Sequence, residues 1–235
     1  MRSAIIVAAG QGLRMGGSIR KPYLPLGGVP ILKRTLSVFT QSGLFEEIIL
    51  VVAANETASC REQIAAGLST SSTLQIIPGG RDRQESVFLG LAASRGQADD
   101  VVLIHDGVRP FVSTEVLSRC LEAAMAYGAC LTAVAACDTL KQTGDDGRIV
   151  QTLPRDAVWM AQTPQGFRLG LIREAHHQAR QEGFMGTDDG QLVERLGRAV
   201  TIVPGSRMNI KITTPEDLQL AEAIWRYARK APGKN

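Results

Sequence analysis

The chain has 235 residues, of which 44% are hydrophobic and 21% are charged, and its formal net charge is +3. This composition is ordinary for a globular protein, and the length accommodates one large domain or two small ones. Lysine and arginine are scattered without a basic run, which argues against a nucleic-acid partner. No run of about 18 apolar residues occurs, so we expect no membrane span and predict a cytoplasmic protein.

The first apolar segment, residues 3–8, predicts a strand that leads directly into a glycine-rich loop. The loop combines four glycines with three cations: Gly10, Gly12, Gly16, Gly17, Arg14, Arg20 and Lys21. Glycine allows backbone N–H groups to approach phosphate oxygens closely, and cations neutralise charge that those dipoles leave unbalanced. The combination predicts a site for a nucleoside triphosphate.

Two better-known phosphate loops do not fit this segment. A Walker loop needs Lys-Ser or Lys-Thr, and neither pair occurs in the chain. The dinucleotide fingerprint Gly-x-Gly-x-x-Gly has Met15 in place of its third glycine, and Lys21-Pro22 is a poor continuation for the helix that should follow. A flexible turn without a ligand is the remaining alternative, and the nearby cations disfavour it.

Farther along the chain, short apolar runs alternate with helical patterns. The runs expected to be strands cover residues 48–52, 74–77, 101–104 and 129–135. The helices expected between them cover residues 30–41, 56–68, 84–94 and 114–127. This alternation predicts an α/β fold, a Rossmann-like and mostly parallel sheet with helices on both faces. Ligands of such sheets bind beyond the carboxyl ends of the strands.

Two segments depart from the alternation. Residues 138–162 contain Thr-Gly-Asp-Asp-Gly between extended stretches at 138–142 and 148–153, which indicates a β-hairpin. Few large apolar residues occur there, so we expect this hairpin to protrude as an arm and to pack on another chain. Thr214 and the proline after it begin a capped C-terminal helix. We therefore predict a single domain over residues 1–235 with an arm.

The four cysteines are Cys60, Cys120, Cys130 and Cys137. They have neither the Cys-x-x-Cys spacing nor the nearby histidine pair typical of a zinc site. A chain of this length can bury a full core, so a disulfide framework is not required for stability. All four are expected to be buried, reduced thiols.

The strand expected at residues 101–104 runs into His105, Asp106 and Gly107. An acid at the mouth of a buried strand is well placed to hold Mg²⁺ that bridges phosphates. Capping a turn is the alternative role of an aspartate before glycine, and the triphosphate-type loop favours the metal. We expect His105 to be structural, and we place His176 and His177 on a helix surface without a role.

A second polar segment, residues 78–87, follows a strand and opens a helix. The backbone at Gly80 and the hydroxyl of Ser86 could read a base edge, and Arg83 could reach a phosphate; a solvated turn is the plainer alternative. Lys211 lies between apolar residues of an extended stretch. It calls for an anion nearby, because a cation buried alone is costly.

Taken in order, these motifs resemble one family, the 2-C-methyl-D-erythritol 4-phosphate cytidylyltransferases of the non-mevalonate isoprenoid pathway. The matching residues cover most of the chain, and the ordered set is more specific than any one motif. They are Ala8-Ala9-Gly10-x-Gly12-x-Arg14-Met15 with Lys21-Pro22, Gly79-Gly80-x-x-Arg83-x-x-Ser86-Val87, His105-Asp106-x-x-Arg109-Pro110, Asp138-Thr139-x-Lys141, Gln162-Thr163-Pro164-Gln165, Thr187-Asp188-Asp189 and Asn209-x-Lys211-x-Thr213. Two departures, Gly107-Val108 for Ala-Ala and Arg81 for Asp, concern backbone contacts and leave the chemistry intact.

The resemblance implies a nucleotidyltransferase-type fold and a set of site residues. Those that would bind CTP are Ala8, Ala9, Gly10, Gly12, Gly80, Arg83, Ser86 and Asp106. Those that would bind the polyol phosphate are Asp106, Arg109, Thr139, Arg155, Thr163, Thr187 and Lys211. Arg14, Lys21 and Lys211 would be catalytic, and Asp106 would hold Mg²⁺ or another divalent cation. Thr139 and Arg155 would come from a second subunit, which implies a homodimer with a dimerisation arm at about 138–162.

The implied reaction joins CTP and methylerythritol phosphate, gives 4-diphosphocytidyl-2-C-methyl-D-erythritol and releases pyrophosphate. A ribitol-5-phosphate cytidylyltransferase is the nearest alternative, because few pocket side chains choose the acceptor. A non-catalytic nucleotide-binding regulator is disfavoured, since pure binding does not require Lys21, Asp106 and Lys211 together. A nicotinamide-dependent dehydrogenase is disfavoured by the missing third glycine.

Overall fold

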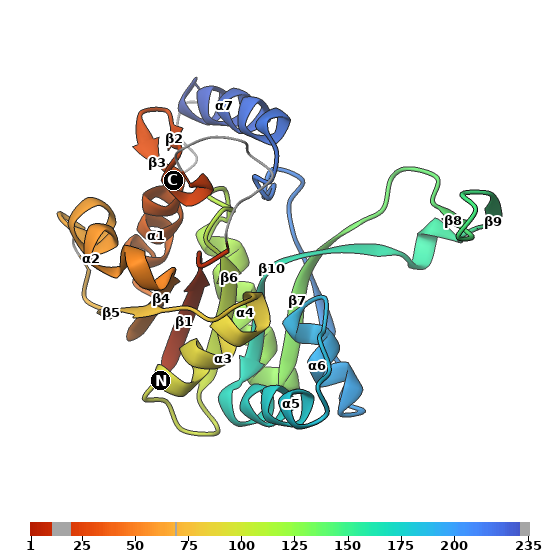
Figure 1. Ribbon diagram of the computed structural model, residues 1–235, viewed down its shortest axis with the longest axis horizontal. Helices are drawn as coiled ribbons and strands as arrows, with labels where there is room; N and C mark the ends of the chain where they lie inside the picture. Colours follow the sequence, from red (N-terminus) through yellow and green to blue (C-terminus); the bar gives the residue numbers. More distant parts are fainter. Residues whose placement is uncertain (11–19, 69, 231–235) are drawn as a thin grey trace.

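The computed structural model describes residues 1–10, 20–68 and 70–230, and a seven-stranded sheet forms its centre (Figure 1). The strands are β1 (Arg2–Val7), β4 (Glu47–Val52), β5 (Thr73–Pro78), β6 (Val101–Asp106), β7 (Ala129–Ala135), β10 (Trp159–Arg168) and β11 (Thr201–Pro204). They lie in the order β11-β7-β10-β6-β1-β4-β5. Neighbours are parallel except where β10 pairs with β6 and β7. The predicted α/β fold with a mostly parallel sheet is confirmed.

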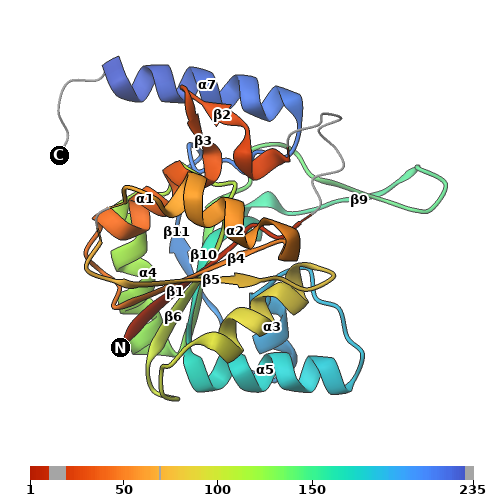
Figure 2. The same ribbon diagram turned by 60° about the vertical axis from the view of Figure 1, so that its left-hand side comes forward.

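Helices cover both faces of the sheet, as predicted (Figure 2). The helices are α1 (Ile31–Gln41), α2 (Thr57–Cys60), α3 (Arg83–Ala93), α4 (Thr114–Tyr127), α5 (Leu169–Gln181), α6 (Asp189–Arg195) and α7 (Pro215–Lys230). Ala4 and Ile6 of β1 pack toward α1, α2 and α4, whereas Ile5 and Val7 pack toward α3, α5 and α6. Because both faces are buried, the strand sequences read as continuous apolar runs. None of the helices in the described part of the chain is long and apolar enough to cross a bilayer.

The helix expected over residues 56–68 is confirmed only in part, because it is irregular and ends at residue 65. The segment holds η3 (Ala54–Glu56), the one turn of α2, and a wider π-helical turn, η4 (Arg61–Ala65). Ala66 is extended and Gly67 has a φ of +74°, a conformation that glycine adopts without strain and that ends the helical path.

The predicted hairpin is present and stands away from the sheet as an arm (Figure 1). Its strands, β8 (Lys141–Thr143) and β9 (Ile149–Thr152), pair antiparallel and are exposed along their length. The last residues of the expected arm belong to the sheet instead, because residues 159–161 of β10 pair with β7.

Helix α7 packs on a small hairpin formed by β2 (Pro25–Leu26) and β3 (Val29–Pro30). A third apolar cluster lies beneath it and includes Val108, Ile212 and Ala221. The backbone N–H of Ile212 also donates to the carbonyl of Val108 at 3.0 Å. This packing holds the segment that carries Lys211 against the loop that follows β6.

Three of the four cysteines are buried free thiols, as expected: Cys60, Cys120 and Cys130. Cys137 is exposed, and the expectation for it is wrong. It lies where the chain leaves β7 for the arm, outside the layers that cover the sheet.

Candidate functional site

The candidate site lies at the carboxyl ends of the central strands β1 and β6. Val7, the last residue of β1, is directly opposite Asp106, the last residue of β6. The backbone N–H of Gly107 donates to the carbonyl of Val7 at 2.8 Å. The sheet therefore brings Asp106 beside Ala8 and Ala9, where the glycine-rich loop begins, as parallel strand topology predicts.

Three cations surround the carboxylate of Asp106, and we call these four residues the Asp106 cluster. Its Oδ1 accepts a hydrogen bond from Arg83 Nε at 3.1 Å, and its Oδ2 lies 2.9 Å from Lys211 Nζ. Arg109 Nε is 3.5 Å from Oδ2 and has no hydrogen-bond partner among the described residues. Burial by itself raises the pKa of Asp106, but Arg83, Lys211 and Arg109 together hold it well below the ordinary value. The carboxylate is therefore ionised near pH 7.

Arg83 joins this cluster to a second buried carboxylate. Its Nη1 lies 2.8 Å from Oδ2 of Asp189, the first residue of α6, and the other oxygen of Asp189 is 3.1 Å from His176 Nε2. Burial lowers the pKa of Arg83, but Asp189 and Asp106 raise it above the ordinary value. Arg83, Arg109 and Lys211 thus face two carboxylates, and the excess of one positive charge favours an anionic ligand.

A cleft of about 250 Å³ opens beside the Asp106 cluster. The predicted polyol-phosphate residues that line it are Asp106, Arg109, Thr163, Thr187 and Lys211. Thr139 and Arg155 lie elsewhere, exposed on the arm and at its base. Arg155 Nη1 donates to the carbonyl of Cys137 at 3.2 Å. The structure therefore brings five of these seven residues together in the cleft. The other two, which were expected to act from a second subunit, lie away from it.

Thr163 and His105 hold the backbone of the turn that carries Asp106. The backbone N–H of Asp106 donates to Thr163 Oγ1 at 3.0 Å, and the same oxygen lies 3.1 Å from His105 Nδ1. The other ring nitrogen of His105 is 3.1 Å from the carbonyl oxygen of Arg109. Burial lowers the pKa of His105 to about 4, so the ring is neutral near pH 7 and holds the turn without adding charge.

Arg20, to which sequence reasoning assigned no specific contact, bonds to the residues where the glycine-rich loop begins. Arg20 Nη2 donates to the carbonyls of Ala9 at 3.0 Å and Gly10 at 2.5 Å, and its Nη1 lies 2.6 Å from Glu56 Oε1. Lys21 begins the short helix η2 (Lys21–Tyr23). The predicted residues Gly12 and Arg14 lie outside the described residues.

The turn before α3 packs tightly against the start of that loop. A Cβ atom on Gly79 would lie 2.3 Å from Cβ of Ala9, so only glycine fits there. Ser86, 1% exposed, accepts from the Gly80 N–H at 3.1 Å and donates to the Asp82 carbonyl at 2.7 Å. The Ser86 hydroxyl is therefore used inside the turn, where it bonds to the backbone of Gly80 and Asp82.

The expectation for His176 is wrong: this residue is 2% exposed and faces the core, whereas His177 is exposed. The signal was available in the sequence, because Leu169, Ile172 and Ala179 place the apolar stripe of α5 on the side of His176. Asp189 stands in a motif that the resemblance matched, but sequence reasoning gave it no role. Its pairing with Arg83 joins residues 106 positions apart, which no local pattern indicates.

Comparison with known proteins places these features in one family. The sequence model of 2-C-methyl-D-erythritol 4-phosphate cytidylyltransferase matches residues 3–227. The enzyme of that name from Geobacter metallireducens is 53% identical over 223 residues, which cover 94% of this chain and 96% of that protein.

Solved structures agree with this match. The 4-diphosphocytidyl-2C-methyl-D-erythritol synthase of Anaerococcus prevotii superimposes with a TM-score of 0.85 at 36% identity, and 96% of each chain is covered. The 2-C-methyl-D-erythritol 4-phosphate cytidylyltransferase of Thermus thermophilus superimposes with a TM-score of 0.76 at 35% identity, over 96% of this chain and all of that one (100%).

Proposed function

We propose that the two substrates of this chain meet at the Asp106 cluster. The chain belongs to the 2-C-methyl-D-erythritol 4-phosphate cytidylyltransferase family. The chain is a nucleotidyltransferase that joins CTP to methylerythritol phosphate, gives 4-diphosphocytidyl-2-C-methyl-D-erythritol and releases pyrophosphate. One observation carries the placement: three cations surround a single ionised carboxylate beside the strand that opens the glycine-rich loop. Such an arrangement suits two anionic reactants.

CTP is assigned to the glycine-rich edge of the site. The backbone of Ala8, Ala9, Gly10, Gly12 and Gly80 would hold the cytosine and ribose, with Ser86 keeping the second turn in shape. Arg14 and Lys21 would grip the triphosphate, and Arg83 would lie at its inner side. The support is the close packing of Gly79 on Ala9, which puts both turns at one edge.

The methylerythritol phosphate is assigned to the cleft beside Asp106. Lys211 and Arg109 are among the donors that line it, and Arg109 Nε has no hydrogen-bond partner in the described part of the chain. The hydroxyls of Thr163 and Thr187 lie near by. A phosphomonoester would give Lys211 a second oxygen partner beside Asp106 and would give Arg109 Nε a hydrogen-bond acceptor.

The arm would complete this cleft in a second copy of the chain, with Thr139 and Arg155 as the contributed residues. Ile149 and Val150 on the arm are 63% and 66% exposed, and Trp159 and Met160 at its base are 40% and 44% exposed. A hairpin this small cannot bury these side chains itself, so a homodimer is the arrangement that fits them.

The proposed chemistry is an in-line attack by a phosphate oxygen of methylerythritol phosphate on the α-phosphorus of CTP. A P–O bond forms there while the bond to the β,γ-diphosphate breaks, and pyrophosphate leaves with the electron pair. The nucleophile is already an anion near neutral pH, so no general base is needed, in keeping with a neutral, buried His105. Lys211, Arg109, Arg14 and Lys21 would supply positioning and charge neutralisation.

A divalent cation such as Mg²⁺ would be held by Asp106, because each carboxylate oxygen keeps a lone pair beside its contact with Arg83 or Lys211. Within residues 1–10, 20–68 and 70–230, no three His, Cys, Asp or Glu side chains form a metal cage. Mg²⁺ commonly takes one or two carboxylates and completes its shell with phosphate oxygens and water, so one aspartate beside a triphosphate is sufficient. When bound, it would neutralise charge on the α-phosphate and on the leaving diphosphate.

Pyrophosphate release tests the assignment. Purified protein is incubated with Mg²⁺, each of the four ribonucleoside triphosphates, and either methylerythritol 4-phosphate or ribitol 5-phosphate. We expect turnover with CTP and methylerythritol phosphate. Preference for ribitol phosphate would support the alternative acceptor, and CTP binding without turnover would support a regulator. We also propose a cytoplasmic location, supported by the use of CTP and by four free cysteines, which suit a reducing compartment.

A further inference from the structure

A series of contacts between charged and polar side chains leads from Asp106 through Arg83 and Asp189 to His176 on α5. Arg83 Nε donates to Asp106 at 3.1 Å, and Nη1 of the same guanidinium lies 2.8 Å from Asp189. The second oxygen of Asp189 is 3.1 Å from His176 Nε2. Asp106, Asp189 and His176 are 5%, 1% and 2% exposed, so water does not compete strongly for these contacts.

Four different elements meet in this chain of contacts: β6, α3, α6 and α5. The backbone N–H groups of Asp189 and Gly190 both donate to Gln165 Oε1, at 3.1 and 3.0 Å. Asp189 is therefore held by its backbone as well as by its carboxylate. A group fixed in both ways can serve as a reference point for the long side chain of Arg83.

We propose that Asp189 and His176 are positioning residues for cytidylyl transfer, which hold the Arg83 guanidinium and thereby the orientation of the Asp106 carboxylate. An arginine with one carboxylate partner can swing with it, whereas one anchored at two points presents a fixed donor. Fixing Oδ1 of Asp106 on Arg83 leaves Oδ2 directed at Lys211. This inference rests on the proposed function of the Asp106 cluster.

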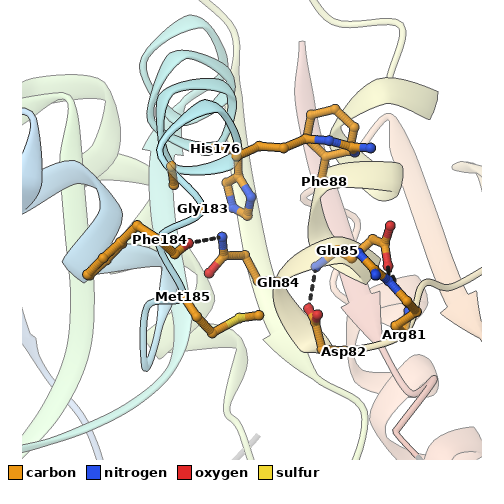
Figure 3. Close-up of a pocket in the computed structure, with 11 residues that line it drawn as sticks. Arg81, Asp82, Gln84, Glu85, Phe88, His176, Gly183, Phe184 and Met185 are labelled. Carbon is orange, nitrogen blue, oxygen red and sulfur yellow. Dashed lines mark hydrogen bonds and ion pairs between the residues drawn. The ribbon is translucent and has the colours of Figure 1, made fainter.

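Figure 3 shows His176 extending from α5 toward the segment that carries Gln84, in a cleft of about 220 Å³ between α3 and α5. Gln84 closes the neighbouring turn, because its amide donates to the Phe184 carbonyl at 3.0 Å and accepts from the Gly186 N–H at 2.9 Å. His177, the next residue on α5, is exposed and contacts Gln181 at 3.0 Å. The chain thus contains a matched control for His176.

The charge balance predicts which kinetic constant changes. Without the Asp189 charge, three cations face one carboxylate, so the attraction for the anionic substrates is kept or increased. The Asp106 carboxylate, however, loses its fixed orientation toward Lys211. A positioning role therefore predicts a lower kcat with CTP affinity retained, which a general loss of structure would not produce.

The test compares His176→Leu, His176→Gln, Asp189→Asn and the control His177→Leu in the pyrophosphate assay, with CTP binding measured by calorimetry and folding by thermal melts. His176→Leu and Asp189→Asn should lower kcat about 10- to 100-fold, as for other supporting residues behind a catalytic group. CTP affinity should stay within about threefold. His176→Gln should recover most of kcat, because its amide reaches the place of Nε2, and His177→Leu should match the wild type.

Equal turnover of His176→Leu and His177→Leu overturns the proposal, as does a parallel loss of kcat and CTP affinity in a folded variant. If His176→Leu does not fold, the isosteric Asp189→Asn decides: unchanged kcat rejects the positioning role. Absence of pyrophosphate release by the wild type would instead reject the proposed function, so the two failures are distinguishable.

Discussion

Replacing Lys211 with alanine removes the cation closest to the Asp106 carboxylate. Its Nζ lies 2.9 Å from Asp106 Oδ2, and its side chain is 39% exposed. A preorganised donor aimed at charge in a transition state is typically worth ~2.7–4 kcal/mol. Because solvent reaches Lys211 and screens it, the lower figure applies. About 2.7 kcal/mol corresponds to a fall of roughly 100-fold in kcat.

The assay is steady-state pyrophosphate release at saturating CTP and methylerythritol phosphate. Lys33→Ala is the control, because Lys33 donates to the carbonyl of Ala66 on the outer side of α1. Lys211→Arg keeps the charge and should retain part of the activity. Turnover of Lys211→Ala within about threefold of the wild type would refute the charge argument, since the expected loss is at least ten times larger.

Three further outcomes follow from the structure. Arg155→Ala should raise KM for methylerythritol phosphate about tenfold or more and leave CTP affinity unchanged, because Arg155 lies at the arm; a collapse of CTP binding in a titration would contradict the arm assignment. With a thiol reagent, exposed Cys137 should react first in the folded protein, and rapid modification of a second thiol before unfolding would count against the described core. Burial raises the pKa of the Cys60 thiol to about 11 from 9.0, so the fold favours the neutral thiol. That stabilisation is complete below pH 9 and is lost as the pH rises through 11, and two pKa units correspond to about 3 kcal/mol. Urea unfolding at pH 9 and pH 11 should show that the free energy of unfolding falls more for the wild type than for Cys60→Ala. Equal falls in the two proteins would disprove this account.

Much of the fold follows from local patterns. The apolar runs that become β4, β6 and β7 are continuous because helices cover both faces of the sheet. That pattern can be recognised in the sequence alone. Parallel strand topology then places Asp106 beside the glycine-rich loop. The exposed hairpin is equally local, since turn residues and sparse apolar content both indicate it.

The failures have physical causes. Residues 56–68 carry no strong helix-breaking residue before Gly67, so helix propensity alone does not indicate the change from α2 to a π-helical turn. His176 was misplaced because histidine is polar, although its position on α5 belongs to the buried stripe. Cys137 was misplaced because its apolar neighbours concealed that the chain leaves the sheet there.

The sequence by itself determined the alternation of strands and helices and the exposed hairpin, because each depends on residues close in the chain. The tertiary structure alone decided how the polar motifs are joined. Asp189 meets Arg83 across 106 positions, Lys211 meets Asp106, and Arg20 meets Glu56. Such pairings arise only when separate elements pack, since charges distant in sequence become neighbours through burial of the apolar faces beneath them.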